Sequence, residues 1–217
     1  MIFIDLTHVM HNNMPRFGAY WHCDTQIEPM GKVVSEGRNT SKLTFGSHAG
    51  THMDSPRHFL DEGRTIDQID VSELIGPVKI VDFSFLGKNE CVTLEMIRKI
   101  ELAEKMIFRF DWSKVWEKGD FYHEYPYFSD EAADYIVNSQ KVKFIGMDTP
   151  SPDDSRIASG SPEDSKIHKK FLRAGIILVE YLNNLDKIDD LDGWTLAALP
   201  LKLENCDGSP IRAVIYK

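Results

Sequence analysis

Short apolar segments, many of them rich in β-branched residues, recur along the chain between polar, glycine-containing turns. Such segments predict β-strands, and several are continuous apolar runs, which is typical of strands buried on both faces. The expected strands are Ile2–Leu6, Lys42–Gly46, Val78–Phe83, Met106–Phe110, Lys143–Met147, Ile176–Glu180, Thr195–Lys202 and Arg212–Tyr216.

Three segments predict helices, each with helix-boundary signals and, in the first, an apolar stripe at helical spacing. Thr93 is the expected N-cap of Leu94–Leu102, and Ser129 that of Asp130–Asn138, whose acidic first turn suits the helix dipole. Pro162–Arg173 has acidic residues early, basic residues late and a glycine just beyond its end. Strands and helices alternate in the middle of the chain and strands cluster at both ends. We therefore expect an α/β fold with a mixed, largely buried sheet.

Composition indicates one globular domain over residues 1–217. Hydrophobic residues make up 42% and charged residues 27%, and no repeat, low-complexity tract or linker divides the chain. The 25 Lys and Arg residues against 34 Asp and Glu residues give a net charge of −9. Nucleic acid and anionic lipid both require a basic surface, so neither is expected as a partner.

Three cysteines, Cys23, Cys91 and Cys206, lie far apart and form no Cys-x-x-Cys pair, so a disulfide framework is not expected. The N-terminal segment Met1–Asp5 becomes polar too early for a signal peptide. No apolar stretch approaches the roughly 18 residues that span a bilayer. These features predict a cytoplasmic protein with no membrane partner.

The segment Ser47–Phe59 concentrates the candidate chemistry. Imidazole and carboxylate groups together suit Zn²⁺, Mn²⁺ or Fe²⁺. Glycine and proline within the segment argue against a helix, so we expect a shaped loop after the strand Lys42–Gly46. A solvated loop that happens to contain histidines is the alternative, which the spacing disfavours. The pattern is His-x3-His-x-Asp-x3-His, at His48, His52, Asp54 and His58.

A second pair of candidates lies downstream. His168 falls in the expected third helix, and Glu180 ends the strand Ile176–Glu180. A carboxylate at the end of an apolar strand is costly to bury unless it is paired or bound to a metal. Considered alone, these residues favour a surface histidine and a salt-bridged glutamate over a metal site.

Five elements of the chain, in order, resemble the cyclase family of metal-dependent hydrolases, which includes bacterial kynurenine formamidases and isatin hydrolases. The histidine segment resembles the family signature His-x-Gly-Thr-His-x-Asp-x-Pro-x-His. The other four elements are the opening Ile4–Thr7, a Gly-x-Asp-Thr-Pro-Ser element at Gly146–Ser151, His168 with the Glu-x-Leu-x-Asn element Glu180–Asn184, and Leu199–Leu201 with Asp207–Arg212.

The resemblance implies a swivelling β/β/α domain, usually in a homodimer or larger assembly. It also implies one or two divalent ions, Zn²⁺ or Mn²⁺, in each subunit. His48, His52 and Asp54 would bind one ion. Asp54 would bridge to a second ion held by His168 and Glu180, which reverses the preference stated above for those two residues.

His58 is the catalytic acid or base that the resemblance implies. An imidazole with an ordinary pKa of about 6.5 can carry a proton to a leaving nitrogen at physiological pH. We expect an arylformamidase that cleaves a C–N amide bond in N-formylkynurenine or a related small aryl formamide. The alternatives are a hydrolase that opens a cyclic amide or lactone, as isatin hydrolase does, and a metal- or ligand-binding protein without catalysis.

Near the N-terminus the chain departs from the family. Relatives often carry Pro-x-aromatic-Pro-Gly-Asp there, and the aromatic residue helps to line the substrate pocket. The stretch Pro15–Trp21 lacks the second proline and the acidic residue, and has Phe17 at the aromatic position. Phe17 is therefore the candidate substrate-binding residue. Asp111–Trp116 and Phe121–Phe128 could also reach a pocket, and Phe121–Phe128 is alternatively an interface segment or a plain core strand.

Overall fold

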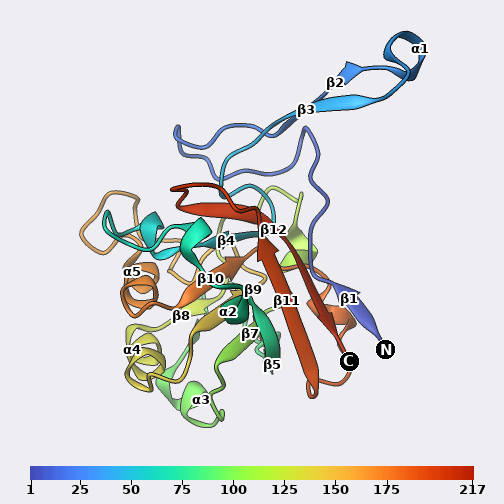
Figure 1. Ribbon diagram of the computed structural model, residues 1–217. Helices are drawn as coiled ribbons and strands as arrows, with labels where there is room; N and C mark the ends of the chain where they lie inside the picture. Colours follow the sequence, from blue (N-terminus) through green and yellow to red (C-terminus); the bar gives the residue numbers. More distant parts are fainter.

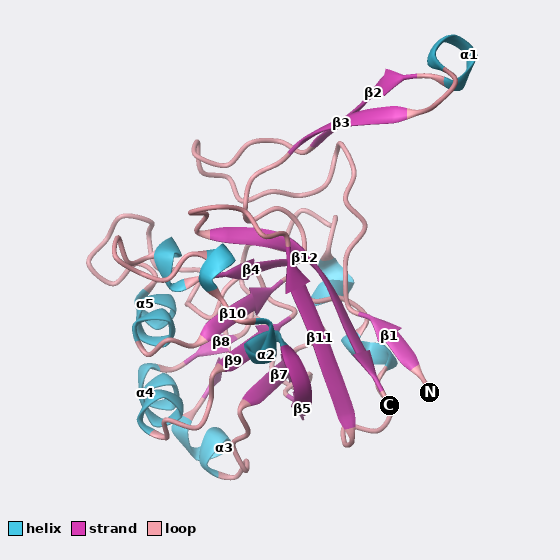
Figure 2. Cartoon of the chain, in the orientation of Figure 1, coloured by secondary structure: helices cyan, strands magenta, loops and turns pink.

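The computed structural model describes residues 1–217, and its main sheet curls into a barrel with helices on one side (Figures 1 and 2). The eight strands of this sheet are β1 (Phe3–Asp5), β4 (His52–Asp54), β5 (Ile75–Asp82), β7 (Lys105–Arg109), β9 (Phe144–Met147), β10 (Ile177–Glu180), β11 (Trp194–Pro200) and β12 (Gly208–Tyr216). Their order is β1-β12-β11-β5-β7-β9-β10-β4, and an additional pairing of β12 with β4 closes the ring.

The sheet is mixed, as the strand and helix pattern predicts. Strands β5, β7, β9 and β10 are parallel neighbours, whereas β4, β11 and β12 pair antiparallel. The α/β class is confirmed. Closure of the sheet was not predicted. It depends on the two ends of β12: the first residues of the strand pair with β4, and the remaining residues pair with β11.

Two hydrophobic cores lie on the two faces of the parallel strands. Side chains alternate along a strand, so Ile177 and Val179 of β10 face one core while Leu178 between them faces the other. Burial on both faces explains why these strands are continuous apolar runs in the sequence. By the same alternation Glu180, the last residue of β10, lies on the same face as Leu178.

Three helices cover the outer face of the barrel: α3 (Leu94–Arg98), α4 (Asp130–Asn138) and α5 (Lys166–Arg173). The expected caps are confirmed, since Thr93 accepts a hydrogen bond from the N–H of Met96 and Ser129 accepts one from Ala132. Helix α3 ends four residues before the expected Leu102. None of the helices is long and apolar enough to cross a membrane.

The segment that contains the expected strand Lys42–Gly46 lies outside the main sheet. Strand β3 (Thr40–Thr44) pairs only with β2 (Gln26–Gly31), and the short helix α1 (Val33–Glu36) joins them. We call residues 26–44 the arm, because this hairpin projects from the body (Figure 1). The remaining elements are short: α2 (Val71–Leu74), the strand pair β6 (Cys91–Val92) and β8 (Tyr127–Phe128), and four 3₁₀ turns at Pro56–His58, Ile66–Gln68, Trp112–Val115 and Leu185–Lys187.

Candidate metal centre

Strand β4 carries two of the candidate ligands and was expected as a loop. Met53 faces the barrel core, so its neighbours His52 and Asp54 both face the opposite side. All three residues are buried. The spacing His-x-Asp is therefore the period of a β-strand, which places both side chains on one face without any special loop geometry.

Pairing with β10 brings a third candidate to the same place. His52 lies directly opposite Glu180 in the antiparallel register. The Nε2 atom of His52 is 3.4 Å from Oδ1 of Asp54 and 3.4 Å from Oε2 of Glu180. Its Nδ1 donates a hydrogen bond to the carbonyl of Gly50 at 2.8 Å, and this bond leaves Nε2 directed at the two carboxylates. When Nε2 loses its proton, the ring therefore keeps the proton on Nδ1, which is the tautomer that a metal ligand needs.

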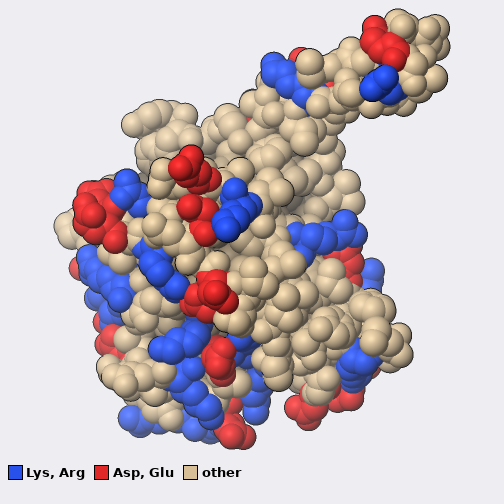
Figure 3. All heavy atoms as spheres, viewed as in Figure 1, with Lys and Arg blue, Asp and Glu red and all other residues tan.

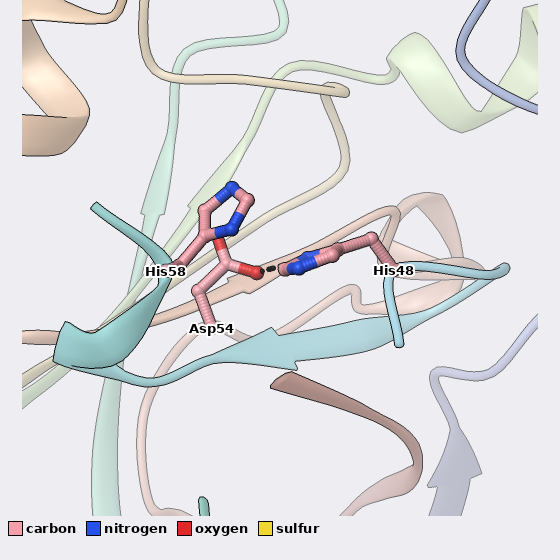
Figure 4. Close-up of side chains that lie close together, drawn as sticks. All are labelled: His48, Asp54 and His58. Carbon is pink, nitrogen blue, oxygen red and sulfur yellow. Dashed lines mark hydrogen bonds and ion pairs between the residues drawn. The ribbon is translucent and has the colours of Figure 1, made fainter. Parts of the chain in front are cut away.

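His48 and His58 approach Asp54 from the loop before β4 and from the 3₁₀ turn after it (Figure 4). Nδ1 of His48 is 2.8 Å from Oδ1 of Asp54. The ring centroids of His48 and His58 are 4.0 Å apart. Ligand atoms of these three residues lie within 4.8 Å of one another, as do those of His52, Asp54 and Glu180. Asp54 belongs to both groups.

His168 reaches the centre from helix α5. Its Nε2 is 2.9 Å from Oε1 of Glu180 and 3.7 Å from Oδ2 of Asp54. Its Nδ1 is 2.6 Å from Oδ2 of Asp153, which must accept the proton. The same carboxylate accepts hydrogen bonds from the N–H groups of Ile167 and His168, so Asp153 caps the helix whose first turn carries the histidine.

The cap explains where α5 begins. The helix was expected from Pro162 with acidic residues in its first turn, but it starts at Lys166, and no acidic residue lies in that turn. The residue before it, Ser165, has φ 53° and makes no side-chain cap. Asp153, twelve residues upstream of Ser165, supplies the carboxylate that the first turn requires.

The carboxylates of this centre favour positive charge on the groups beside them. Burial alone would lower the pKa of His52, but Asp54 and Glu180 raise it to about 10. Burial is also outweighed at His168, where Glu180 and Asp153 raise the pKa well above its ordinary value. Oδ2 of Asp54 and Oε1 of Glu180 are buried and accept no hydrogen bond, although both lie within 3.7 Å of Nε2 of His168. Unbonded carboxylate oxygens beside imidazole nitrogens are the donor set of a divalent metal ion, so these residues fit one.

Asp207 adds a carboxylate from the segment that enters β12. Its Oδ2 is 2.6 Å from Nε2 of His48 and 3.3 Å from Nδ1 of His58. Burial would raise the pKa of Asp207, but hydrogen bonds from the two imidazoles lower it strongly. The next residue, Gly208, pairs with Asp54 across the strands, so β12 closes the barrel at the metal centre itself.

Aromatic rings lead from the N-terminal segment to the histidines. Phe17 contacts His22 with ring centroids 5.6 Å apart, and His22 lies 6.1 Å from His48. Phe17 also contacts Tyr122 at 5.9 Å, and Tyr122 continues through Tyr181 to His52. Within Phe121–Phe128, the residues Phe121, Tyr125 and Phe128 are buried in the core, whereas Tyr122 reaches this series of rings.

The structure thus brings all six residues of the expected centre together: His48, His52, Asp54, His58, His168 and Glu180. Phe17 does not contact these six residues directly, but it contacts His22, whose ring lies near His48. Three residues with contacts to the centre were not predicted, namely His22, Asp153 and Asp207. Asp207 stands at the start of the C-terminal element that resembles the family, which was the one available signal. Asp153 and His22 lie in irregular segments without a periodic pattern.

The chain is similar in sequence to known proteins. Residues 4–154 match a family model described as "Putative cyclase". A kynurenine formamidase of Bacillus cereus is 33% identical over 221 aligned residues, which cover 98% of this chain and 96% of that protein.

Solved structures with the same fold include two hydrolases. An isatin hydrolase bound to the product analogue thioisatinate has a TM-score of 0.87 and 26% identity, covering 98% of this chain and 91% of that one. A predicted metal-dependent hydrolase from Bacillus stearothermophilus has a TM-score of 0.76 and 23% identity, covering 99% and 97% of the two chains. At 23% identity the second comparison shows the fold alone.

Proposed function

The chain belongs to the putative cyclase family, and we propose that it is a metal-dependent amidohydrolase that cleaves the C–N bond of N-formylkynurenine or a related small aryl formamide. The similarity to a kynurenine formamidase over 98% of the chain supports this substrate class. One structural observation carries the proposal: one buried oxygen each of Asp54 and Glu180 accepts no hydrogen bond and lies near His168, and the other oxygens of the two carboxylates lie beside His48 and His52. A bound cation would satisfy these oxygens.

In this proposal His48, His52 and Asp54 hold one divalent ion, and Asp54, His168 and Glu180 hold a second. Zn²⁺ and Mn²⁺ both suit imidazole and carboxylate ligands. When bound, such an ion lowers the pKa of water toward neutrality and polarises an amide carbonyl.

Protein residues orient these ligands. The carbonyl of Gly50 fixes the tautomer of His52, and Asp153 fixes that of His168. Helix α5 packs against one core and Met53 of β4 lies in the other, so His52, Asp54 and His168 stand on packed elements.

His58 is the residue that we propose moves the proton. It follows Pro56 in a 3₁₀ turn, and its ring lies against His48 and 6.2 Å from His168. Burial, the largest effect, lowers the pKa of His58 and outweighs the opposing attraction of Asp54. Its Nδ1 faces Asp207 at 3.3 Å, so the neutral ring carries its proton there, and Nε2 is the atom free to take a proton from the attacking water and pass it to the leaving amine.

A second candidate reaction is the opening of a cyclic amide or lactone. The TM-score of 0.87 with an isatin hydrolase favours it, and the fold alone does not distinguish the two because substrate choice depends on residues of the pocket. The pocket segment Pro15–Trp21 departs from the family pattern, with Phe17 as the proposed substrate contact. A metal- or ligand-binding protein without catalysis is the remaining alternative.

Turnover of N-formylkynurenine and isatin by the same preparation tests these alternatives. The chain is stripped with a chelator, reloaded with Zn²⁺ or Mn²⁺ and assayed with each substrate. We expect activity only after reloading, with N-formylkynurenine the better substrate. A higher kcat/KM for isatin would favour ring opening. No turnover of either by protein that binds the metal would reject the hydrolase for these substrates.

We also propose that the enzyme is a homodimer or larger homo-oligomer of the cytoplasm. The family resemblance supports the oligomer. The three cysteines, all free, are compatible with a reducing compartment. Sedimentation at micromolar concentration tests the oligomer, and a species of only 24.8 kDa would reject it.

A further inference from the structure

A cavity of about 480 Å³ lies beside the aromatic rings that lead to the metal centre. Two aromatic side chains line it, Phe121 and Tyr122, together with the polar residues His11, Asn13 and Glu117. A volume of this size is typical of sites for small molecules. None of the six residues of the proposed centre lines it. The cavity is therefore a separate space whose role the metal chemistry does not explain.

Tyr122 connects this cavity with the metal centre. The centroid of its ring lies 5.9 Å from that of Phe17 and 5.9 Å from that of Tyr181. The ring of Tyr181 in turn lies 4.8 Å from that of His52. Phe17 is the proposed substrate contact, so a substrate that reaches the metal beside Phe17 also lies beside Tyr122. Any group that projects from such a substrate on the side of Tyr122 can enter the cavity.

The hydroxyl group of Tyr122 has no partner in the protein. Its oxygen is buried and makes no hydrogen bond. Burial, the largest effect, raises the pKa of Tyr122 above its ordinary value, so the phenol keeps its proton at neutral pH and is a hydrogen-bond donor. A buried hydroxyl without a partner is costly for the folded protein. A ligand atom that accepts this hydrogen bond would remove the cost.

The other end of the cavity is polar and open to solvent. Oε1 of Glu117 lies 2.8 Å from Nε2 of His11, and the two side chains are 55% and 40% exposed. Phe121, in contrast, is buried in the core. The carboxylate of Glu117 is suited to an ammonium group, and the side-chain amide of Asn13 can donate to a carboxylate. The cavity thus combines an aromatic, buried end with a polar end that suits both signs of charge.

We propose that this cavity binds the substituent of the substrate's aryl ring, a zwitterionic α-amino acid group attached through a ketone. N-formylkynurenine carries such a chain on the ring position next to the formamide. With the formamide at the metal centre, Tyr122 donates its hydrogen bond to the ketone oxygen and Glu117 binds the ammonium group. This inference rests on the function proposed above and names the residues that select among aryl formamides.

Selection then depends on a few polar groups and not on the charge of the surface. Figure 3 shows Lys and Arg mixed with Asp and Glu over the visible face of the body, without a large patch of one sign. A site that hydrogen-bonds a substrate group discriminates against an analogue without that group, because its own buried polar atoms then stay unpaired. Formanilide and isatin both lack the chain and would leave the hydroxyl of Tyr122 without a partner.

Tyr122→Phe and Glu117→Gln test the cavity with two substrates, N-formylkynurenine and formanilide. The measured quantity is the ratio of their kcat/KM values. Tyr122→Phe should lower this ratio about 10-fold, the effect of one lost hydrogen bond. Glu117→Gln should lower it about 3-fold, since a half-exposed ion pair contributes less. The control is Tyr135→Phe on α4, whose ring lies beneath Arg98 and which should keep the wild-type ratio. Circular dichroism and metal content check that each variant folds.

The outcomes separate this inference from the proposed function. A wild-type enzyme that hydrolyses N-formylkynurenine, with an unchanged ratio in Tyr122→Phe, overturns the role of the cavity and leaves the hydrolase standing. A ratio that falls equally in Tyr135→Phe overturns it as well. If metal-loaded wild-type protein hydrolyses neither substrate, the proposed function fails, and calorimetry with kynurenine decides the cavity. Binding that weakens about 10-fold in Tyr122→Phe would support it, and no binding to the wild-type protein would overturn it.

Discussion

Asp153 holds His168 at two points: its Oδ2 atom lies 2.6 Å from Nδ1 of the ring and accepts the backbone N–H at 3.1 Å. One carboxylate therefore caps helix α5 and orients the histidine at its first turn. Nε2 of His168 is left facing Glu180. Carboxylates in this position raise the basicity of a ligand imidazole and fix its orientation.

Asp153→Asn should therefore weaken metal binding while the helix persists. The amide oxygen can still accept the N–H of Ile167, but the amide nitrogen cannot accept the proton of His168. We expect the metal dissociation constant to rise about 10–100-fold, the usual effect of removing such a partner. Competition with a chromophoric chelator measures it. Asp154→Asn is the matched control, because Asp154 pairs with Arg156 and not with the centre. Equal affinities in both variants would contradict the role of Asp153.

His58→Ala should retain bound metal but lose turnover by about 10²–10⁴-fold, the scale of a lost general acid or base. Asp54→Ala should lose metal and activity together, since Asp54 belongs to both groups of candidate ligands. Metal analysis and kinetics on the two variants distinguish these cases. His123→Ala is the control for His58, because His123 is exposed. If His58→Ala strips the metal as thoroughly as Asp54→Ala, His58 is a ligand and the proton moves through another group.

How far the sequence predicts this centre depends on the kind of pattern each residue lies in. Strand β10 is a continuous apolar run with Glu180 at its end, so both the strand and its unusual carboxylate are visible in the sequence. Strand β4 has only three residues, two of them polar, and hydropathy cannot identify it. Its strand character comes from pairing with β10 and β12, which are distant in sequence.

Contacts formed by irregular segments are the least predictable. Asp153 caps a helix from a loop, and Asp207 meets His48 across 159 positions of sequence. Neither contact follows from local propensity, because each exists only once the barrel has closed. The barrel closure is itself a long-range pairing, so the sequence predicts its strands but not the ring that they form.

Metal binding should release protons and strengthen as pH rises. Asp54 and Glu180 raise the pKa of His52 to about 10 against the opposing effect of burial. A raised pKa means that the protonated ring stabilises the metal-free fold fully below about pH 6.5 and that this contribution is lost as pH rises toward 10. A metal ion needs the same nitrogen without its proton.

Calorimetry in buffers of different ionisation enthalpy measures this release. At pH 8 we expect at least one proton to leave for each centre filled, and the apparent affinity to increase between pH 6.5 and 10. An affinity that is constant over this range would contradict protonation of the histidines in the metal-free protein. Asp153→Asn should reduce the proton release, because Asp153 contributes to the raised pKa of His168.

Gly208→Ala should damage the centre without removing any ligand. A Cβ atom at this position would lie 2.8 Å from the carbonyl oxygen of Met53 and 2.9 Å from Cε1 of His48. The carbonyl belongs to the backbone of β4, so it cannot move aside without shifting the strand that carries His52 and Asp54. We expect a loss of roughly 1–3 kcal/mol in the free energy of unfolding, typical of overpacking, together with a lower metal content.

Thermal unfolding and metal analysis after reloading measure the two effects of Gly208→Ala. Gly87→Ala is the control, since its Cβ would meet only the side chain of Glu90, at 3.6 Å. Because the clash involves both β4 and His48, the metal affinity should fall even at temperatures where the variant is fully folded. A variant that unfolds at a lower temperature but binds metal normally would show that β12 closes the barrel without setting the position of His48. A variant that resembles Gly87→Ala in both measurements would show that the close approach of β12 to β4 at Gly208 is unnecessary.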